Sequence, residues 1–284
     1  MDENEGRWAF PWADADEDAE VIFLTVPDDG GSEFEGAAEG PQEMMRWMEE
    51  LHCVRNEQGG KLDVEKPLEG GPSVTVHDAG DEEYPELEKR AAGWREKGQR
   101  IIAVGGDHSN TEALVRGVRP GSLLWLDAHP DFWKAPGRSY AAGLRHLIDD
   151  GVVNAANVKM VGLRSVNEPH RQELRDLGML GQFDGMLDPM YEVVAFLRDA
   201  VKPIYVTVDI DACDPAFAPG VSDPVPGGLT SREIIHIVRL CAQSPDLAAL
   251  DIMEYVPARD EGFRTASLVG WLAVEALSNL PVLN

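Results

Sequence analysis

Three apolar runs of strand length each end directly in carboxylates or a histidine, and this pattern limits the fold more than any other feature of the chain. The central run, Leu123–Leu126, is followed at alternate positions by Asp127, His129 and Asp131. Alternate residues of an extended chain point to the same side, so these three side chains converge if the chain stays extended beyond Leu126. The pattern predicts a buried strand with a polar cluster at its carboxyl end.

The other two runs repeat this arrangement upstream and downstream. Ile101–Val104 leads into Gly105-Gly106-Asp107-His108-Ser109, and Ile204–Val208 leads into Asp209-Ile210-Asp211-Ala212-Cys213-Asp214-Pro215. Open α/β sheets place their sites beyond the carboxyl ends of the strands, so we expect the three strand ends to lie side by side. The side chains that would meet there are His108, Asp127, His129, Asp131, Asp209 and Asp211.

Carboxylates crowded into one cleft repel one another unless cations neutralise them. A carboxylate-rich set with some imidazole suits hard or borderline divalent ions, above all Mn²⁺, and the absence of cysteine from the set argues against a structural zinc site. Any one of these Asp-x-His or Asp-x-Asp pairs alone is more often a solvated loop or a helix cap than a ligand pair. Their joint occurrence at three strand ends predicts a centre with two Mn²⁺ ions.

Length and composition limit the number of domains and the kinds of partner that the protein can bind. The 284 residues, 43% of them hydrophobic, suffice for one large α/β domain, and the even spread of strand-like runs favours one domain over two. Twenty-five basic against 51 acidic residues give a formal net charge of −26, which opposes binding to nucleic acid or to an anionic membrane. Such a charge suits a salty cytoplasm, and it also fits a simple need for solubility.

The compartment follows from the termini and the cysteines. No apolar run reaches the ~18–20 residues of a membrane span, and the acidic start Met1–Glu5 is unlike a signal peptide. Cys53, Cys213 and Cys241 are too scattered for a disulfide framework. We therefore expect a cytoplasmic protein without a membrane partner.

The order of patterns along the chain predicts the architecture. Residues 1–18 are acidic and poor in aliphatic side chains, so we expect an N-terminal arm that Trp8, Phe10 and Trp12 hold against a single domain of residues 19–284. Strand and helix patterns alternate within that domain, which predicts a three-layer α/β/α sandwich with a mostly parallel central sheet. Predicted strands cover 21–26, 73–77, 101–104, 123–126, 158–162, 204–208 and 247–252, and predicted helices include 84–97, 168–177, 189–200 and 265–280.

Taken in order, the motifs Gly-Gly-Asp-His-Ser at 105–109, Asp-Ala-His-x-Asp at 127–131 and Asp-x-Asp-x-x-Asp-Pro at 209–215 resemble the signatures of the ureohydrolase superfamily, which includes arginases, agmatinases and formimidoylglutamases. The resemblance extends from about residue 21 to residue 280. It implies an arginase-like fold, a hydrolase that cleaves a C–N bond of a linear amidine, and two Mn²⁺ ions per subunit. It also implies a homo-oligomer, a trimer or a hexamer.

The resemblance implies a role for each polar residue of the cluster. His108 and Asp131 would serve one ion, His129 and Asp211 the other, and Asp127 and Asp209 would bridge them. Asp131 would also accept a proton from the attacking water. Glu254 would hold the cationic amidine in a bidentate, charge-assisted pair. The alternative interpretation is that Glu254 is a solvated carboxylate at a strand end without a functional role. Asp107 and Asp214 would not bind metal themselves but would orient the ligand residues and their loops by hydrogen bonds.

The loop after Asp131 departs from the family pattern. Arginases and agmatinases carry a histidine there, whereas this chain reads Ser-Tyr-Ala-Ala-Gly-Leu-Arg-His at 139–146, in which His146 comes a few residues too late. Formimidoylglutamases also lack that histidine, and residues 218–224 resemble theirs.

The same loop is locally basic, since Lys134, Arg138 and Arg145 lie between Phe132 and Ile148 without any acid. These three residues would attract a carboxylate on the substrate tail, although solvated loop charges are the alternative. We therefore predict an amidine with an anionic tail, such as formimidoylglutamate. The alternatives are agmatinase or arginase activity, which releases urea, or a non-catalytic relative that binds metal and ligand without turnover.

Overall fold

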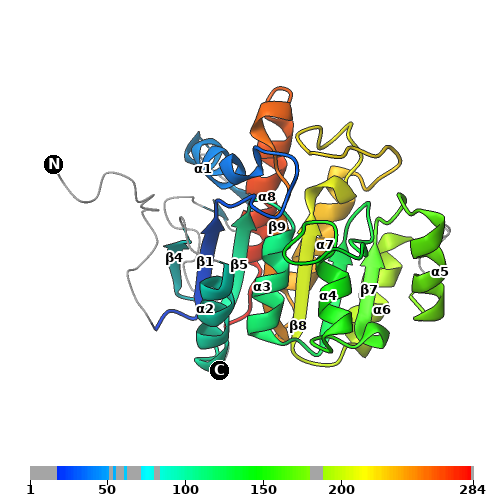
Figure 1. Ribbon diagram of the computed structural model, residues 1–284. Helices are drawn as coiled ribbons and strands as arrows, with labels where there is room; N and C mark the ends of the chain where they lie inside the picture. The colour runs from blue at the N-terminus through cyan, green and yellow to red at the C-terminus, as the bar shows by residue number, and fades with distance from the viewer. Residues whose placement is uncertain are drawn as a thin grey trace.

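The computed structural model describes residues 18–50, 54–55, 61–62, 72–79, 84–179 and 188–282. Its centre is a seven-stranded sheet in the order β4-β1-β5-β9-β8-β6-β7, in which every pairing is parallel (Figure 1). The strands of this sheet are β1 (Val21–Val26), β4 (Val74–Asp78), β5 (Arg100–Gly105), β6 (Ser122–Leu126), β7 (Val158–Val161), β8 (Ile204–Asp209) and β9 (Leu247–Met253). Two short strands, β2 (Val54–Arg55) and β3 (Lys61–Leu62), form a separate antiparallel pair.

Helices cover both faces of the sheet, which confirms the predicted three-layer α/β/α sandwich. One face packs against α1 (Gly40–Glu50), α6 (Pro189–Asp199), α7 (Ser231–Ala242) and α8 (Arg264–Ser278). The other packs against α2 (Tyr84–Glu96), α3 (Ser109–Val118), α4 (Gly143–Asp149) and α5 (Glu168–Asp176). Short 3₁₀ helices occur at η1 (Ala37–Glu39), η2 (Ala155–Asn157), η4 (Ile210–Ala212) and η5 (Pro257–Arg259).

Alternation along the strands explains why both layers of helices are needed. In β1, Val21 and Phe23 point into one core while Ile22 and Leu24 point into the other. All six residues of β1 are buried, as expected when a parallel sheet is covered on both sides. The continuous apolar runs of the sequence therefore mark strands of this central sheet.

The strand order brings four polar segments to one edge. Strands β5, β9, β8 and β6 are consecutive neighbours and run in the same direction, so their carboxyl ends meet at one edge of the sheet. His108 follows β5, Glu254 follows β9, Asp209 ends β8 and Asp127 follows β6. The topology thus assembles a site from segments up to 146 positions apart in the chain.

The predicted elements lie within a few residues of the observed ones: the strand expected at 73–77 is β4, and the helix expected at 265–280 is α8. Residues 1–17, which include Trp8, Phe10 and Trp12, and also Cys53, lie outside the described residues. The division into an arm and a single domain stays a prediction. Among the helices that the structure describes, none is long and apolar enough to cross a membrane.

Candidate metal centre

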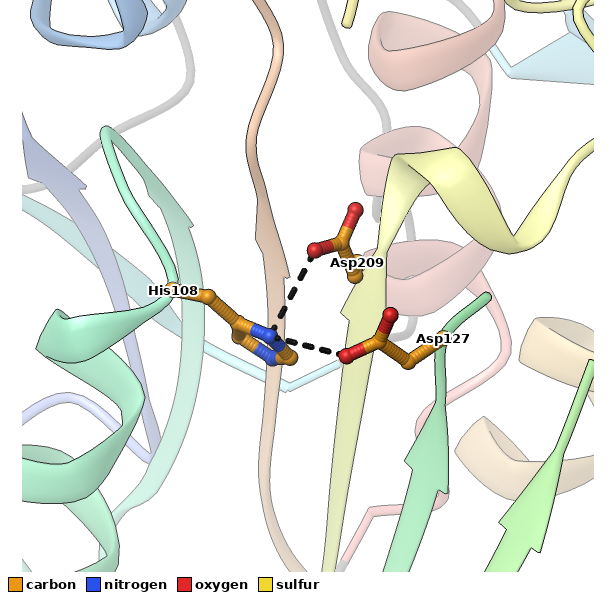
Figure 2. A group of neighbouring side chains, drawn as sticks. All are labelled: His108, Asp127 and Asp209. Carbon is orange, nitrogen blue, oxygen red and sulfur yellow. Dashed lines mark ion pairs between the residues drawn. The ribbon is translucent and has the colours of Figure 1, made fainter. Parts of the chain in front are cut away.

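One half of the site is built around the imidazole of His108, at the turn between β5 and α3. Its Nδ1 atom lies 2.9 Å from Asp131 Oδ2, 3.3 Å from Asp127 Oδ2 and 3.5 Å from Asp209 Oδ2. Figure 2 shows the carboxylates of Asp127 and Asp209 turned toward this ring from two neighbouring strands. Within the described residues, neither His108 Nδ1 nor Asp131 Oδ2 has a hydrogen bond of good geometry, although both atoms are buried. Buried polar atoms that face one another in this way suit a shared cation.

The other half is built around His129. Its Nδ1 atom lies 2.9 Å from Asp211 Oδ2 and 3.6 Å from Asp127 Oδ1. The ligand atoms of His108, Asp127 and Asp209 lie within 4.8 Å of one another, and so do those of Asp127, His129 and Asp211. Asp127 belongs to both groups, as a bridging ligand would. The structure therefore brings all six predicted ligands together, while their role as ligands stays a prediction.

Burial makes it costly to keep several carboxylates of this cluster ionised at the same time. Burial raises the pKa of Asp209 well above its usual range, and burial together with the charge of Asp127 raises the pKa of Asp131 to about 7. Burial likewise opposes ionisation of Asp127, but the neighbouring imidazoles of His108 and His129 hold its pKa well below the usual range. Divalent cations between the oxygens would stabilise all the carboxylates in the charged form. The donor set of carboxylates and imidazoles fits Mn²⁺.

Several hydrogen bonds orient the carboxylates of two predicted ligands. Trp125 Nε1 donates to Asp127 Oδ2 at 2.9 Å, and the backbone N–H of His129 donates to Asp127 Oδ1 at 2.6 Å. Asp211 Oδ1 accepts from the backbone N–H of Ala128 at 3.0 Å. These contacts leave other lone pairs of both carboxylates directed at the centre of the cluster.

Glu254 and Asp131 share an unusual backbone. Both are non-glycine residues with positive φ, 69° for Glu254 and 45° for Asp131, a conformation that costs energy and occurs often at functional sites. Glu254 is 4% exposed, and its Oε1 accepts from the backbone N–H of His108 at 2.8 Å. Burial raises the pKa of Glu254 to about 8. Its carboxylate is therefore held beside the His/Asp cluster by the turn that carries His108.

Asp107 and Asp214, predicted to support the ligands, each fix a loop. Asp107 is fully buried, and its Oδ2 accepts from the backbone N–H of Gly31 at 2.7 Å. Asp214 accepts from the backbone N–H groups of Ala216 at 2.9 Å and Gly227 at 2.6 Å. These bonds tie down the loops next to His108 and Asp211. A direct effect on the ligands stays a prediction.

A cavity of 240 Å³ opens above the cluster. Sequence reasoning identified its floor, formed by His129, Asp131, Asp209, Asp211 and Glu254, but it missed most of the wall. The missed residues are Trp133, Tyr140, Ser165, Asn167, His170, Ser222 and Asp223. Part of this wall follows the carboxyl end of β7, so the rule that located the ligands could also have located Ser165 and Asn167.

The basic residues of the loop after β6 do not line this cavity. Lys134 pairs with Glu173 at 2.9 Å, Arg138 pairs with Asp28 at 2.6 Å, and Arg145 pairs with Glu173 and Asp149. Their assignment to the substrate tail stays a prediction, and these contacts do not favour it.

His146 does not lie at the cavity either. Its Nδ1 pairs with Glu112 Oε2 at 2.9 Å and its Nε2 lies 2.9 Å from the carbonyl oxygen of Ala135. Both ring nitrogens are engaged away from the cavity, so these contacts do not favour His146 as a replacement for the histidine that the resemblance gives to arginases and agmatinases.

The parallel α/β sandwich carries, at the carboxyl edge of its sheet, two groups of His and Asp side chains that could hold metal ions. The chain belongs to the arginase family, whose model matches residues 19–278, and it is accordingly a hydrolase of amidine C–N bonds. Proclavaminate amidinohydrolase of Streptomyces clavuligerus is 31% identical over 91% of this chain and 87% of its own length. A solved structure of that enzyme gives a TM-score of 0.80 at 27% identity, covering 92% of this chain and 91% of that one.

Two further comparisons cover most of this chain. Human mitochondrial guanidino acid hydrolase is 30% identical over 93% of this chain and 79% of its own length. Formimidoylglutamase from Bacillus subtilis has a TM-score of 0.81, covering 94% of this chain and 89% of that one, but at 17% identity it shows the fold alone.

Proposed function

We propose that this chain hydrolyses a guanidino compound to urea, with two Mn²⁺ ions per subunit held by His108, Asp127, His129, Asp131, Asp209 and Asp211. The convergence of these six side chains beneath Glu254 is the observation that carries the proposal. Two relatives at 30% identity or more, which cover 91% and 93% of this chain, are named for amidino and guanidino substrates. A guanidino group is therefore favoured over the formimino group of formimidoylglutamate. A trimeric or hexameric assembly and a cytoplasmic location stay predictions.

The residues of the floor would divide the chemistry between them. When bound, the two ions would supply a water molecule that loses a proton near neutral pH. Asp131 Oδ2 faces the cluster without a hydrogen bond among the described residues, and it would accept that proton. The carboxylate of Glu254 would pair with the planar cationic guanidinium, and this charge would favour the ionised form of Glu254.

The wall of the cavity would hold the substrate tail. His170 is 7% exposed and packs its ring edge-to-face on Trp133, with 4.6 Å between the ring centres. The indole of Trp133 is uncharged, and desolvation lowers the pKa of His170, which favours its neutral imidazole. We propose that neutral side chains, His170 and Trp133 among them, bind the tail by hydrogen bonds and ring contacts rather than by an Arg or Lys ion pair.

The test is a substrate panel assayed on Mn²⁺-loaded protein. Arginine, agmatine, 4-guanidinobutanoate and formimidoylglutamate would be compared, with urea and formamide measured separately. Release of urea from a guanidino compound is the expected result. If the protein releases formamide from formimidoylglutamate and no urea from any guanidino compound, the substrate is an anionic formimino compound instead. If it releases no product from any of these amidines, the proposal that the protein is catalytic is wrong.

A further inference from the structure

A chain of buried hydroxyl groups connects Asp251, in the middle of β9, to the ring of His108. Tyr205 Oη donates to Asp251 Oδ2 at 2.6 Å, and Thr111 Oγ1 donates to the same oxygen at 2.9 Å. Thr111 Oγ1 lies 3.3 Å from Thr207 Oγ1, which lies 2.9 Å from His108 Nε2. All five side chains are at most 1% exposed. The chain therefore runs from the centre of the sheet to the metal centre without contact with solvent.

The direction of these hydrogen bonds follows from the chemistry of the groups. A carboxylate only accepts, so the single hydroxyl hydrogen of Thr111 points to Asp251. Thr111 Oγ1 can then only accept from Thr207, whose own hydrogen is directed away from His108. Thr207 Oγ1 is left as an acceptor toward the imidazole, so His108 Nε2 must carry the hydrogen. In the neutral form of this ring the lone pair is then at Nδ1, the atom that faces Asp127, Asp131 and Asp209.

We infer that Asp251 is a positioning residue that acts through Thr207 to hold His108 in the Nε2–H tautomer, with Nδ1 presented to the cation. The inference rests on the proposed metal role of His108. Asp251 touches neither the cavity nor the cluster among the described residues.

The surroundings support a fixed orientation of the ring. The indole of Trp125 packs against the imidazole of His108 with 4.4 Å between ring centres. The pairing of β8 with β9 places Thr207 directly beside Asp251, so sheet register sets the hydroxyl chain. A carboxylate at 0% exposure among apolar strands is costly to bury, and orienting a ligand gives a physical reason for its presence.

The decisive variants are Thr207→Val, which removes the acceptor at nearly constant volume, and Thr207→Ser, which keeps it. Asp251→Asn is the second test. An amide can donate as well as accept, so Asn at this position would no longer fix the direction of the hydrogen bonds from Thr111 and Thr207. Metal-free protein would be titrated with Mn²⁺ while free Mn²⁺ is followed by electron paramagnetic resonance. We expect the affinity for one of two ions to fall about 10- to 100-fold in Thr207→Val and Asp251→Asn, and to be retained in Thr207→Ser.

A spectroscopic readout separates positioning from general destabilisation. In Zn²⁺-loaded protein labelled with ¹⁵N-histidine, we expect an exchange-protected Nε2–H resonance in the wild type that is lost in Thr207→Val and recovered in Thr207→Ser. Glu275→Gln is the matched control, since Glu275 is a buried carboxylate that pairs with Arg239 between α7 and α8. Its melting temperature should fall while the Mn²⁺ affinity stays at the wild-type value.

The outcomes keep this inference and the proposed function apart. Wild-type protein that binds two Mn²⁺ ions, with unchanged affinity in both Thr207→Val and Asp251→Asn, would overturn the positioning role alone. Wild-type protein that binds no Mn²⁺ would overturn the proposed metal centre. If Asp251→Asn does not fold, the Val and Ser variants of Thr207 still decide the question.

Discussion

The floor and the wall of the cavity are built in different ways. The floor consists of side chains at the ends of adjacent parallel strands, and its carboxylates Asp131, Asp209, Asp211 and Glu254 are each at most 5% exposed. The wall comes from connections and from the start of α5, and it includes Trp133, which is 54% exposed. Sheet register holds the floor in place, whereas side-chain contacts between separate loops hold the wall. We therefore expect the chemistry to depend on the floor and substrate choice to depend on the wall.

The largest expected effect is at Asp127, the proposed bridging ligand. Asp127→Asn removes a negative charge that both groups of proposed ligands share. We expect kcat/KM to fall about 1,000-fold or more, because the two ions would lower the activation free energy by several kcal/mol. Asp209→Asn, tested in parallel, should behave in the same way. Elemental analysis should find fewer than two tightly held Mn²⁺ ions per subunit in each variant. Two retained ions in either one would exclude that residue as a bridge.

Glu254→Gln should separate substrate binding from metal binding within the floor. Loss of a charge-assisted pair costs roughly 1.5–3 kcal/mol, so kcat/KM should fall about ten- to a hundredfold. Elemental analysis should still find both ions. Loss of an ion in this variant would place Glu254 among the ligands instead.

His170→Ala tests whether the wall of the cavity binds the substrate tail. A neutral hydrogen bond contributes about 0.5–1.5 kcal/mol, so we expect KM to rise about two- to tenfold with kcat nearly unchanged. Steady-state kinetics on the best guanidino substrate would measure both constants. An equal fall in kcat at constant KM would instead assign His170 to the chemical step.

Lys134→Ala should have the smallest effect. The side chain is 69% exposed and pairs with Glu173 on the surface, so the free energy of unfolding should change by less than about 0.5 kcal/mol. For both anionic and cationic substrates, kcat/KM should stay at the wild-type value. A ten- to hundredfold loss confined to anionic substrates would show that this base does contact a substrate carboxylate.

The floor and the fold could be predicted because their signals are local. A continuous apolar run identifies a buried parallel strand, and the polar residues directly after it lie at the sheet edge wherever the strand sits. That reasoning located His108, Asp127, His129, Asp131, Asp209 and Asp211 without knowledge of the strand order. The order β5-β9-β8-β6 then brought them into contact.

The wall depends on pairs that no local pattern encodes. Three basic residues in a loop predict a positive surface, but Lys134 and Arg145 both meet Glu173 of α5, which lies 39 and 28 positions away. The hydroxyl chain behind His108 likewise joins residues of α3, β8 and β9. Such contacts arise when helices pack on the sheet, since a long side chain pairs with whichever partner the packing brings within reach. The sequence alone determined which polar residues follow which strands. The pairing of charges and the hydroxyl partner of His108 Nε2 depended on the packed fold.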